Sequence, residues 1–269
     1  MSNGDEYYGS SDQVALMKRS RALWLLLQGN PRYSYYGRLV ALSDPDEDTV
    51  EVLYALSKLQ GATCCYFYPA SAASSLFAEL ETRGLTTDRH EHYWGGEGAL
   101  AASRQVQEDH KLPFDLTVSI VDTQTPEKMV SDIAELSQAC DVMPVPGSIM
   151  RGQVRKGLCL VVIDQNGNVV ATASSYINHH PSSPRANDVF WGMLATRQDR
   201  RGERIALLLG AQAIIHMWEN HGARGFMTGV RANNPSSQAL CNKLGVGASE
   251  WVYASCINKE LHSGAAITK

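Results

Sequence analysis

Three arginines and one glycine stand at the junction between a predicted strand and a long predicted helix. The run Arg200-Arg201-Gly202-Glu203-Arg204 precedes an apolar segment that begins at Ile205. The first turn of a helix offers backbone N–H groups without helical partners and the positive end of the helix dipole, and both bind phosphate oxygens. Cations in this turn oppose the dipole, and a bound anion would explain them. We therefore predict an anion site here, with a solvated basic cluster as the alternative.

Two segments between residues 190 and 246 resemble the GCN5-related N-acetyltransferase (GNAT) family. Residues 193–209 resemble the family loop, Gln/Arg-x-x-Gly-x-Gly/Ala after a central strand, with Arg201 first, Ala206 last and Arg204 in place of the middle glycine. Residues 234–246 resemble the family's Asn-x-x-Ala-x-x-Leu-Tyr-x-Lys-x-Gly-Phe. The two matches come in order and at the expected distance, and the resemblance extends over residues 116–258.

The resemblance implies a mixed sheet that opens between its fourth and fifth strands to admit the pantetheine arm of acetyl-CoA, the expected co-substrate. The backbone N–H of Leu194 would then polarise the thioester carbonyl. Thr196 would make the next contact and Asn234 would touch the arm. The expected cofactor-binding residues are Leu194, Thr196, Arg201, Gly202, Glu203, Arg204, Ile205, Ala206, Asn234 and Ser237.

Transfer to an amine needs a base for the amine proton and can use an acid for the leaving thiolate. The family's tyrosine acid falls on Cys241, whose alternative role is that of a small buried residue. Asp188 is the better placed of two nearby carboxylates, the other being Glu219, and its alternative role is that of a turn residue. His179 and His180 lie in a Pro/Ser-rich loop, where we expect a flexible, exposed pair.

These residues favour an enzyme that moves an acetyl group from acetyl-CoA to a primary amine by direct attack. A non-catalytic acyl-CoA-binding sensor or regulatory protein is the alternative, favoured by Arg204 and Cys241. A nucleotide at the 200–204 helix start is a third reading. The acceptor cannot be read from the residues.

The elements that must position the site form an alternating set in the second half of the chain. Short β-rich runs flank the Asn-Gly turn at 164–168, which predicts a hairpin. The predicted strands are 116–121, 158–163, 169–177, 189–196, 225–230 and 251–257, and the predicted helices open at 125–127 and span 202–221 and 235–244. The pattern predicts an α/β fold, a mixed, mostly antiparallel sheet flanked by helices, and the resemblance implies that this sheet is GNAT-like.

The first half has its own α/β pattern. We expect a flexible lead-in at 1–20, an N-terminal domain at 21–110 and the transferase domain at 111–269, with a Gly-rich linker at 95–110 that could turn helical at its end. The predicted helices are 22–28, 48–60 and 71–83, and the predicted strands are 38–42, 63–68 and 90–94. This half is either a degenerate GNAT-like copy or a generic α/β extension. Its aromatic residues are candidates for an acceptor pocket or for the core: Tyr33, Tyr35, Tyr36, Tyr66, Phe67, Tyr68, Tyr93 and Trp94.

Composition sets the broad class. Apolar residues make up 44% and charged residues 19%, which is typical of a globular protein, and a net charge of −4 gives no general attraction for nucleic acid. The longest early apolar run, 22–27, is too short to span a bilayer, so we expect a cytoplasmic protein without a membrane partner. The six cysteines lack CxxC spacing, which predicts reduced thiols and no metal site. Oligomerisation is left open.

Overall fold

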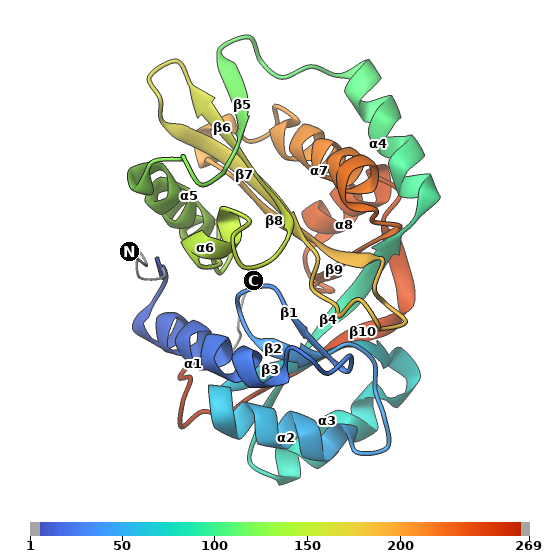
Figure 1. Cartoon of the computed structure of the whole chain (residues 1–269). Coiled ribbons are helices and arrows are strands. Elements are labelled where there is room, and N and C mark those ends of the chain that lie inside the picture. Colours follow the sequence, from blue (N-terminus) through green and yellow to red (C-terminus); the bar gives the residue numbers. More distant parts are fainter. Residues whose placement is uncertain (1–5, 265–269) are drawn as a thin grey trace.

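The computed structural model describes residues 6–264 and contains a ten-stranded sheet with helices on both faces (Figure 1). The strands are β1 (Tyr33–Tyr35), β2 (Val40–Leu42), β3 (Ala62–Pro69), β4 (Thr86–Gly95), β5 (Leu116–Ile120), β6 (Gly157–Asp164), β7 (Val169–Tyr176), β8 (Asp188–Thr196), β9 (Gly225–Val230) and β10 (Gly247–Ile257). The helices are α1 (Ser11–Leu27), α2 (Thr49–Gln60), α3 (Ala73–Thr82), α4 (Glu97–Asp109), α5 (Glu127–Ala139), α6 (Gly147–Met150), α7 (Ile205–His221) and α8 (Pro235–Lys243). The predicted mixed, mostly antiparallel sheet flanked by helices is confirmed.

Strands β5 to β8 form an antiparallel meander that leads to the predicted site. The β6–β7 turn is fixed by Asp164, whose Oδ1 accepts bonds from the backbone N–H groups of Asn166 and Asn168 at 3.0 and 2.9 Å. Gly167 has a φ of +79°, which glycine adopts without steric cost. The Asn-Gly pattern therefore predicted this hairpin for the right physical reason.

Helices cover both faces of the sheet, so strand β6 has apolar residues on both of its faces. On β6, Cys159 and Val161 face the core built with α1, α5 and α6, whereas Leu158, Leu160 and Val162 face the core under α7. This alternation is the period of two that a strand imposes. A third core lies between the N-terminal strands and helices α2 and α3.

Helix α7 lies very close to β8 because glycine stands at the contact. The indole Nε1 of Trp191 donates to the carbonyl oxygen of Gly210 at 3.0 Å. A Cβ on Gly210 would lie 2.9 Å from the Trp191 ring, which is too close for any other residue. This contact fixes the start of α7 relative to the central strand that carries the predicted acyl site.

The strands of the two halves interleave. The order is β1-β2-β3-β10-β4-β9-β8-β7-β6-β5, so β4 from the N-terminal half lies between β9 and β10. Strand β10, in turn, lies between β3 and β4. The sheet therefore runs without a break across the boundary predicted near residue 110.

Two sequence predictions need correction. The supposed lead-in contains α1, which begins at Ser11 behind a capping box of Ser10 and Gln13 and buries Leu16 and Met17. Of that lead-in, residues 1–5 lie outside the described part of the chain. The supposed linker at 95–110 is helix α4, packed on α7.

The glycine that suggested a linker serves close packing instead. A Cβ on Gly95 would lie 2.5 Å from the carbonyl oxygen of Gly245, so the chain before α4 can pass the end of α8 only with glycine there. Strand β1 and helix α6 were not predicted, and α1 is longer than the predicted 22–28.

Candidate functional site

A cavity of about 580 Å³ opens where β8 and β9 separate. These parallel strands pair only from Asp188 to Phe190 on β8 and from Gly225 to Met227 on β9. Beyond that point both strands line the cavity instead of pairing. The opening between the fourth and fifth strands of a GNAT-like sheet is therefore present.

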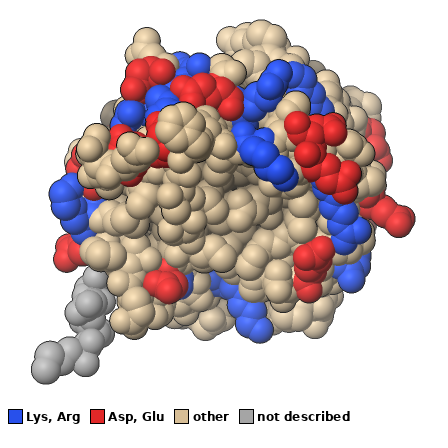
Figure 2. All heavy atoms as spheres, turned by 90° about the horizontal axis from the view of Figure 1, so that it is seen from above, with Lys and Arg blue, Asp and Glu red and all other residues tan. Residues whose placement is uncertain are grey.

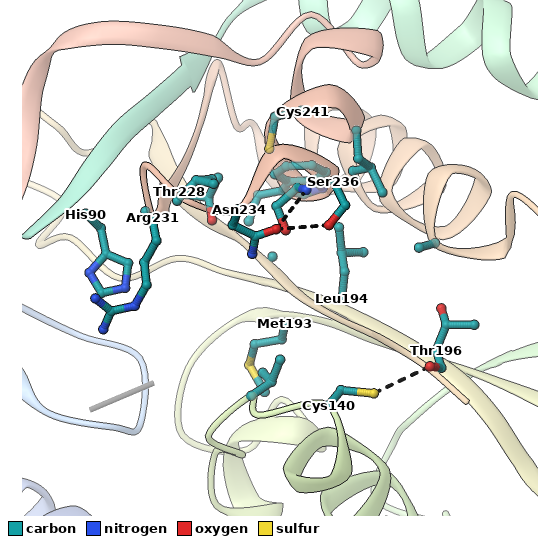
Figure 3. A pocket seen from close by; sticks show the side chains of 18 of the residues that line it. His90, Cys140, Met193, Leu194, Thr196, Thr228, Arg231, Asn234, Ser236 and Cys241 are labelled. Atoms are coloured by element: carbon teal, nitrogen blue, oxygen red, sulfur yellow. Dashed lines mark hydrogen bonds between the residues drawn. The ribbon is translucent and has the colours of Figure 1, made fainter. Parts of the chain in front are cut away.

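A bulge marks β8 at the predicted acyl position. Its register with β7 shifts between the pairs Thr172–Ala195 and Ser174–Gly192, so two β8 residues, Met193 and Leu194, face one residue of β7. Met193 has a φ of +52°, an unusual conformation for a side chain of its size. Bulges interrupt a ladder and re-aim its groups, and here the interruption lies on the cavity wall (Figure 3).

The loop before α7 turns its backbone toward the same cavity. Gly202 has a φ of +89° and Arg204 a φ of +61°. The first backbone bond across the helix start runs from Leu208 N–H to Arg204 C=O at 3.0 Å, so the N–H groups of residues 205–207 precede the helical ladder. These residues line the cavity, so backbone N–H groups without helical partners lie where the anion site was predicted.

The three arginines of this loop have different surroundings. Arg200 makes paired bonds to Asp115, at 2.8 and 3.2 Å, and to Glu203, at 2.7 and 2.8 Å. Arg201 and Arg204 are exposed. Arg201 donates to the carbonyl oxygen of Thr196 at 3.3 Å. Arg200 and Glu203 therefore brace the loop, and the other two arginines supply positive charge at the cavity mouth.

Residues further along the cavity could hold the pantetheine arm. Thr196 Oγ1 is buried and has no hydrogen-bond partner among the described residues, as expected of a group that bonds to a ligand. Asn234 Oδ1 caps α8 by accepting from Ser237 N–H at 3.2 Å and from Ser236 Oγ at 2.9 Å. This leaves its Nδ2 group as the part of the side chain that a ligand could use.

A model of the acetyltransferase (GNAT) family matches residues 132–246. The chain contains a GNAT domain. The matched segment includes the bulged strand, the loop before α7 and helix α8, which are the parts that form the cavity described above.

Solved structures share the fold at low sequence identity. A tandem GNAT protein from the clavulanic acid biosynthesis pathway is 13% identical, with a TM-score of 0.54 over 81% of this chain and 74% of that one. A GCN5-related N-acetyltransferase from Kribbella flavida is 12% identical, with a TM-score of 0.54 over 90% and 95% of the two chains. A GCN5-related N-acetyltransferase-like protein from Streptococcus suis is 18% identical, with a TM-score of 0.51 over 84% and 81%. No curated protein matches the sequence significantly.

Only one of the two predicted catalytic residues, the candidate acid, lines the cavity. Cys241 on α8 lines the cavity and is 3% exposed, and burial raises the pKa of its thiol to about 12. Asp188 is not among the residues that line the cavity. It accepts a bond from Trp94 Nε1 at 3.0 Å, and burial raises its pKa. The structure therefore brings Cys241, but not Asp188, to the predicted site.

The other candidate bases also lie away from the cavity of the GNAT domain. Glu219 forms an exposed ion pair with Arg104 at 2.9 Å. His179, predicted to be exposed and flexible, is fully buried: Ser43 Oγ lies 2.7 Å from its Nδ1 and Asn178 Nδ2 lies 3.2 Å from its Nε2. The loop is held by these bonds, and the prediction for His179 was wrong.

The N-terminal half supplies polar groups that the sequence did not single out. Asp88 on β4 is paired with Arg231, which follows β9, through two bonds of 2.8 Å. His90 lines the cavity beside Arg231 (Figure 3), with its Nδ1 3.9 Å from Asp88 Oδ2. Asp88, His90 and His92 are buried while Arg89 is exposed. This alternation of polar residues along β4 was the sequence feature that could have indicated these cavity residues.

Aromatic residues from both halves form the far end of the cavity. Of the eight predicted, Tyr36 and Tyr66 line it, and Tyr253 from β10 joins them. Tyr36 stacks on Phe190 of the GNAT domain with ring centroids 4.1 Å apart. The N-terminal half therefore contributes a wall to the GNAT cavity.

The surroundings of the GNAT domain carry mixed charge. Figure 2 shows basic and acidic side chains interspersed around the margin of one face and a broad uncharged centre. Within residues 6–264, no cluster of three or more His, Cys, Asp or Glu could hold a metal ion. In the same part of the chain, no helix is both long and apolar enough to cross a bilayer.

Proposed function

We propose that this protein transfers an acetyl group from acetyl-CoA to a primary amine. The observation that carries the proposal is the continuity of one cavity from the N–H groups at the start of α7 to the bulge in β8. A phosphate-bearing, elongated thioester matches that combination, because the helix start suits an anion and the strand opening suits the arm.

In the proposed reaction, the amine nitrogen attacks the thioester carbonyl carbon and a C–N bond forms. The carbonyl oxygen gains negative charge, which the Leu194 N–H stabilises. The C–S bond then breaks, its electron pair leaves with sulfur, and the CoA thiolate takes a proton from solvent. The proton lost by nitrogen goes to a base.

His90 is the best-placed candidate for that base. Its ring lines the cavity, whereas Asp188 and Glu219 do not reach it. Its Nδ1 lies 3.9 Å from the carboxylate of Asp88, which is itself paired with Arg231.

A non-catalytic acyl-CoA sensor is the second candidate. It is favoured by arginine in the middle glycine position of the family loop and by the pKa of about 12 at Cys241, because neither residue is tuned for turnover. Both candidates bind CoA, but only the enzyme consumes the thioester.

Two measurements separate these candidates. Calorimetric titration with acetyl-CoA tests binding, and the appearance of free thiol over a panel of primary amines tests transfer. We expect binding together with amine-dependent thiol release. Binding without release from any amine would favour the sensor, and no binding of either acetyl-CoA or CoA would exclude both.

A further inference from the structure

Arg38 is a buried cation in the wall of the cavity. It lies between β1 and β2, is 5% exposed, and lines the end of the cavity that the N-terminal half encloses. Its guanidinium carbon is 5.7 Å from the centroid of the Tyr36 ring and 6.0 Å from that of Phe190. The charged group is thus held among aromatic rings beside the strand that carries the acyl site.

The charge of Arg38 has no carboxylate partner in the described chain. Nη2 donates to the carbonyl oxygen of Met143, and Nη1 is 3.5 Å from the Tyr36 hydroxyl. Nε is buried without a hydrogen-bond partner among residues 6–264, and the ion pairs of that part of the chain do not include Arg38. Burying a charge is costly unless a counter-charge accompanies it.

Two other arginines of the same cavity have carboxylate partners. Arg231 is neutralised by Asp88 through two bonds of 2.8 Å, and Arg200 is neutralised by Asp115 and Glu203. Arg38 alone among these three is buried at the acceptor end with an uncompensated charge. A ligand anion at this end of the cavity would supply the missing counter-charge.

We propose that Arg38 binds a carboxylate of the acceptor, so that the acceptor is an amino acid or a related aminocarboxylate. This inference rests on the proposed transfer to an amine. A single guanidinium matches the planar fork and the single charge of a carboxylate. A phosphate dianion would leave one negative charge uncompensated in the same place.

The first test needs no variant. Free L-amino acids and ω-aminocarboxylates of increasing length are compared with their primary carboxamides, which remove the charge and keep the shape. With acetyl-CoA present, we expect at least one acid to be used with a KM about tenfold to a hundredfold below that of its carboxamide, as a charged bidentate contact implies. Equal KM values throughout each series would overturn the proposal.

The second test substitutes Arg38. Arg38→Met should abolish the preference for the acid, measured as the ratio of the acid KM to the carboxamide KM, and Arg38→Lys should retain part of that preference. Arg155→Met is the matched control, because Arg155 donates to the backbone carbonyls of Ile177 and His179 and does not line the cavity. A preference that survives Arg38→Met would overturn the proposal.

Binding separates this proposal from the proposed function. Calorimetry of the same acids and carboxamides with the CoA-loaded protein requires no turnover. If thiol is never released but the acids bind more tightly than the carboxamides, the transferase proposal fails and the carboxylate site stands. If neither series binds in a way that depends on Arg38, the carboxylate site fails, whatever the turnover with other amines.

Discussion

Arg201 and Cys241 line the same cavity but differ in their exposure to solvent. Arg201 is exposed at the mouth, whereas Cys241 is buried on α8. Arg201 offers a solvent-exposed positive charge, whereas Cys241 offers a buried thiol. Substitutions at these positions therefore test cofactor binding and chemistry independently.

Arg201→Glu should weaken CoA binding by about tenfold or more, because it replaces an attraction for phosphate with a repulsion at the helix start. Calorimetry at low and high salt measures the effect, which should shrink as salt screens it. Arg104→Glu, an equal change of charge on α4 outside the cavity, is the control. Equal CoA affinity in the Arg201 variant and the wild type would place the phosphates elsewhere.

Cys241→Ala should leave kcat within about threefold of wild type. A thiol whose pKa is about 12 is a poor donor to a departing thiolate whose ordinary pKa is near 8.5. Cys256→Ala is a matched control, since burial also raises the pKa of Cys256 to about 12 and it lies outside the cavity. A hundredfold loss of steady-state thiol release confined to Cys241→Ala would assign Cys241 the role of acid.

At the scale of elements, helix α7 begins at a residue with a left-handed backbone conformation, and that residue is not glycine. Arg204 is the N-cap residue and has a φ of +61°. A side chain in the left-handed region costs about 1–2 kcal/mol. Arginine therefore stands here in a backbone conformation that glycine adopts without steric cost.

Arg204→Gly should be more stable than Arg204→Ala by about 1 kcal/mol, because both remove the charge and only glycine accepts the positive φ. Urea unfolding of the two variants measures the difference. Alanine at least as stable as glycine would mean that the loop does not hold this φ in solution. Tighter CoA binding by the glycine variant would further show that the strained loop limits the cofactor site.

Local pattern predicted the elements on the expected cofactor side of the site. The strand before the loop, α7 and α8 each follow from a short stretch of sequence, and the spacing of two such stretches suggested how they are used. The linker at 95–110 failed for a local reason: Gly95 was interpreted as a break, although it permits close contact with Gly245. A glycine alone does not tell a flexible segment from a tightly packed one.

The acceptor side could not be predicted from local pattern. Arg38, Asp88 and Arg231 line one cavity because β4 pairs with β9 and the N-terminal strands close the same sheet. Strand pairing across such long sequence separations leaves no periodicity in any one segment. The buried polar residues of β4 marked that strand as unusual without indicating its neighbour.

Across the whole molecule, buried histidines link the two halves. His179, between β7 and β8, packs 5.9 Å from Phe67 of β3, and His92 of β4 packs 4.6 Å from the same ring, centroid to centroid. Burial lowers the pKa of each histidine to about 3. Both rings are therefore neutral in the folded protein at every pH at which it is expected to work.

This arrangement makes stability depend on pH. Between pH 6.5 and 3 the unfolded chain binds protons at these rings and the folded chain does not, so stability is present above about pH 6.5 and falls as the pH drops. We expect the free energy of unfolding in urea to fall by about 2 kcal/mol for each histidine between about pH 7 and about pH 5. His179→Gln should remove about half of that loss, and a flat profile would contradict the burial of these rings.

The interleaved sheet also dictates an order of assembly. During synthesis β3 and β4 emerge long before β10, yet β10 lies between them in the finished sheet. Until β10 is synthesised, the edges of β3 and β4 that it joins have no partner strand. Those edges can accept the β10 strand of a second molecule instead. Domain-swapped dimers that exchange β10 are the misassembly to which this topology is most exposed, and concentrated refolding would favour them.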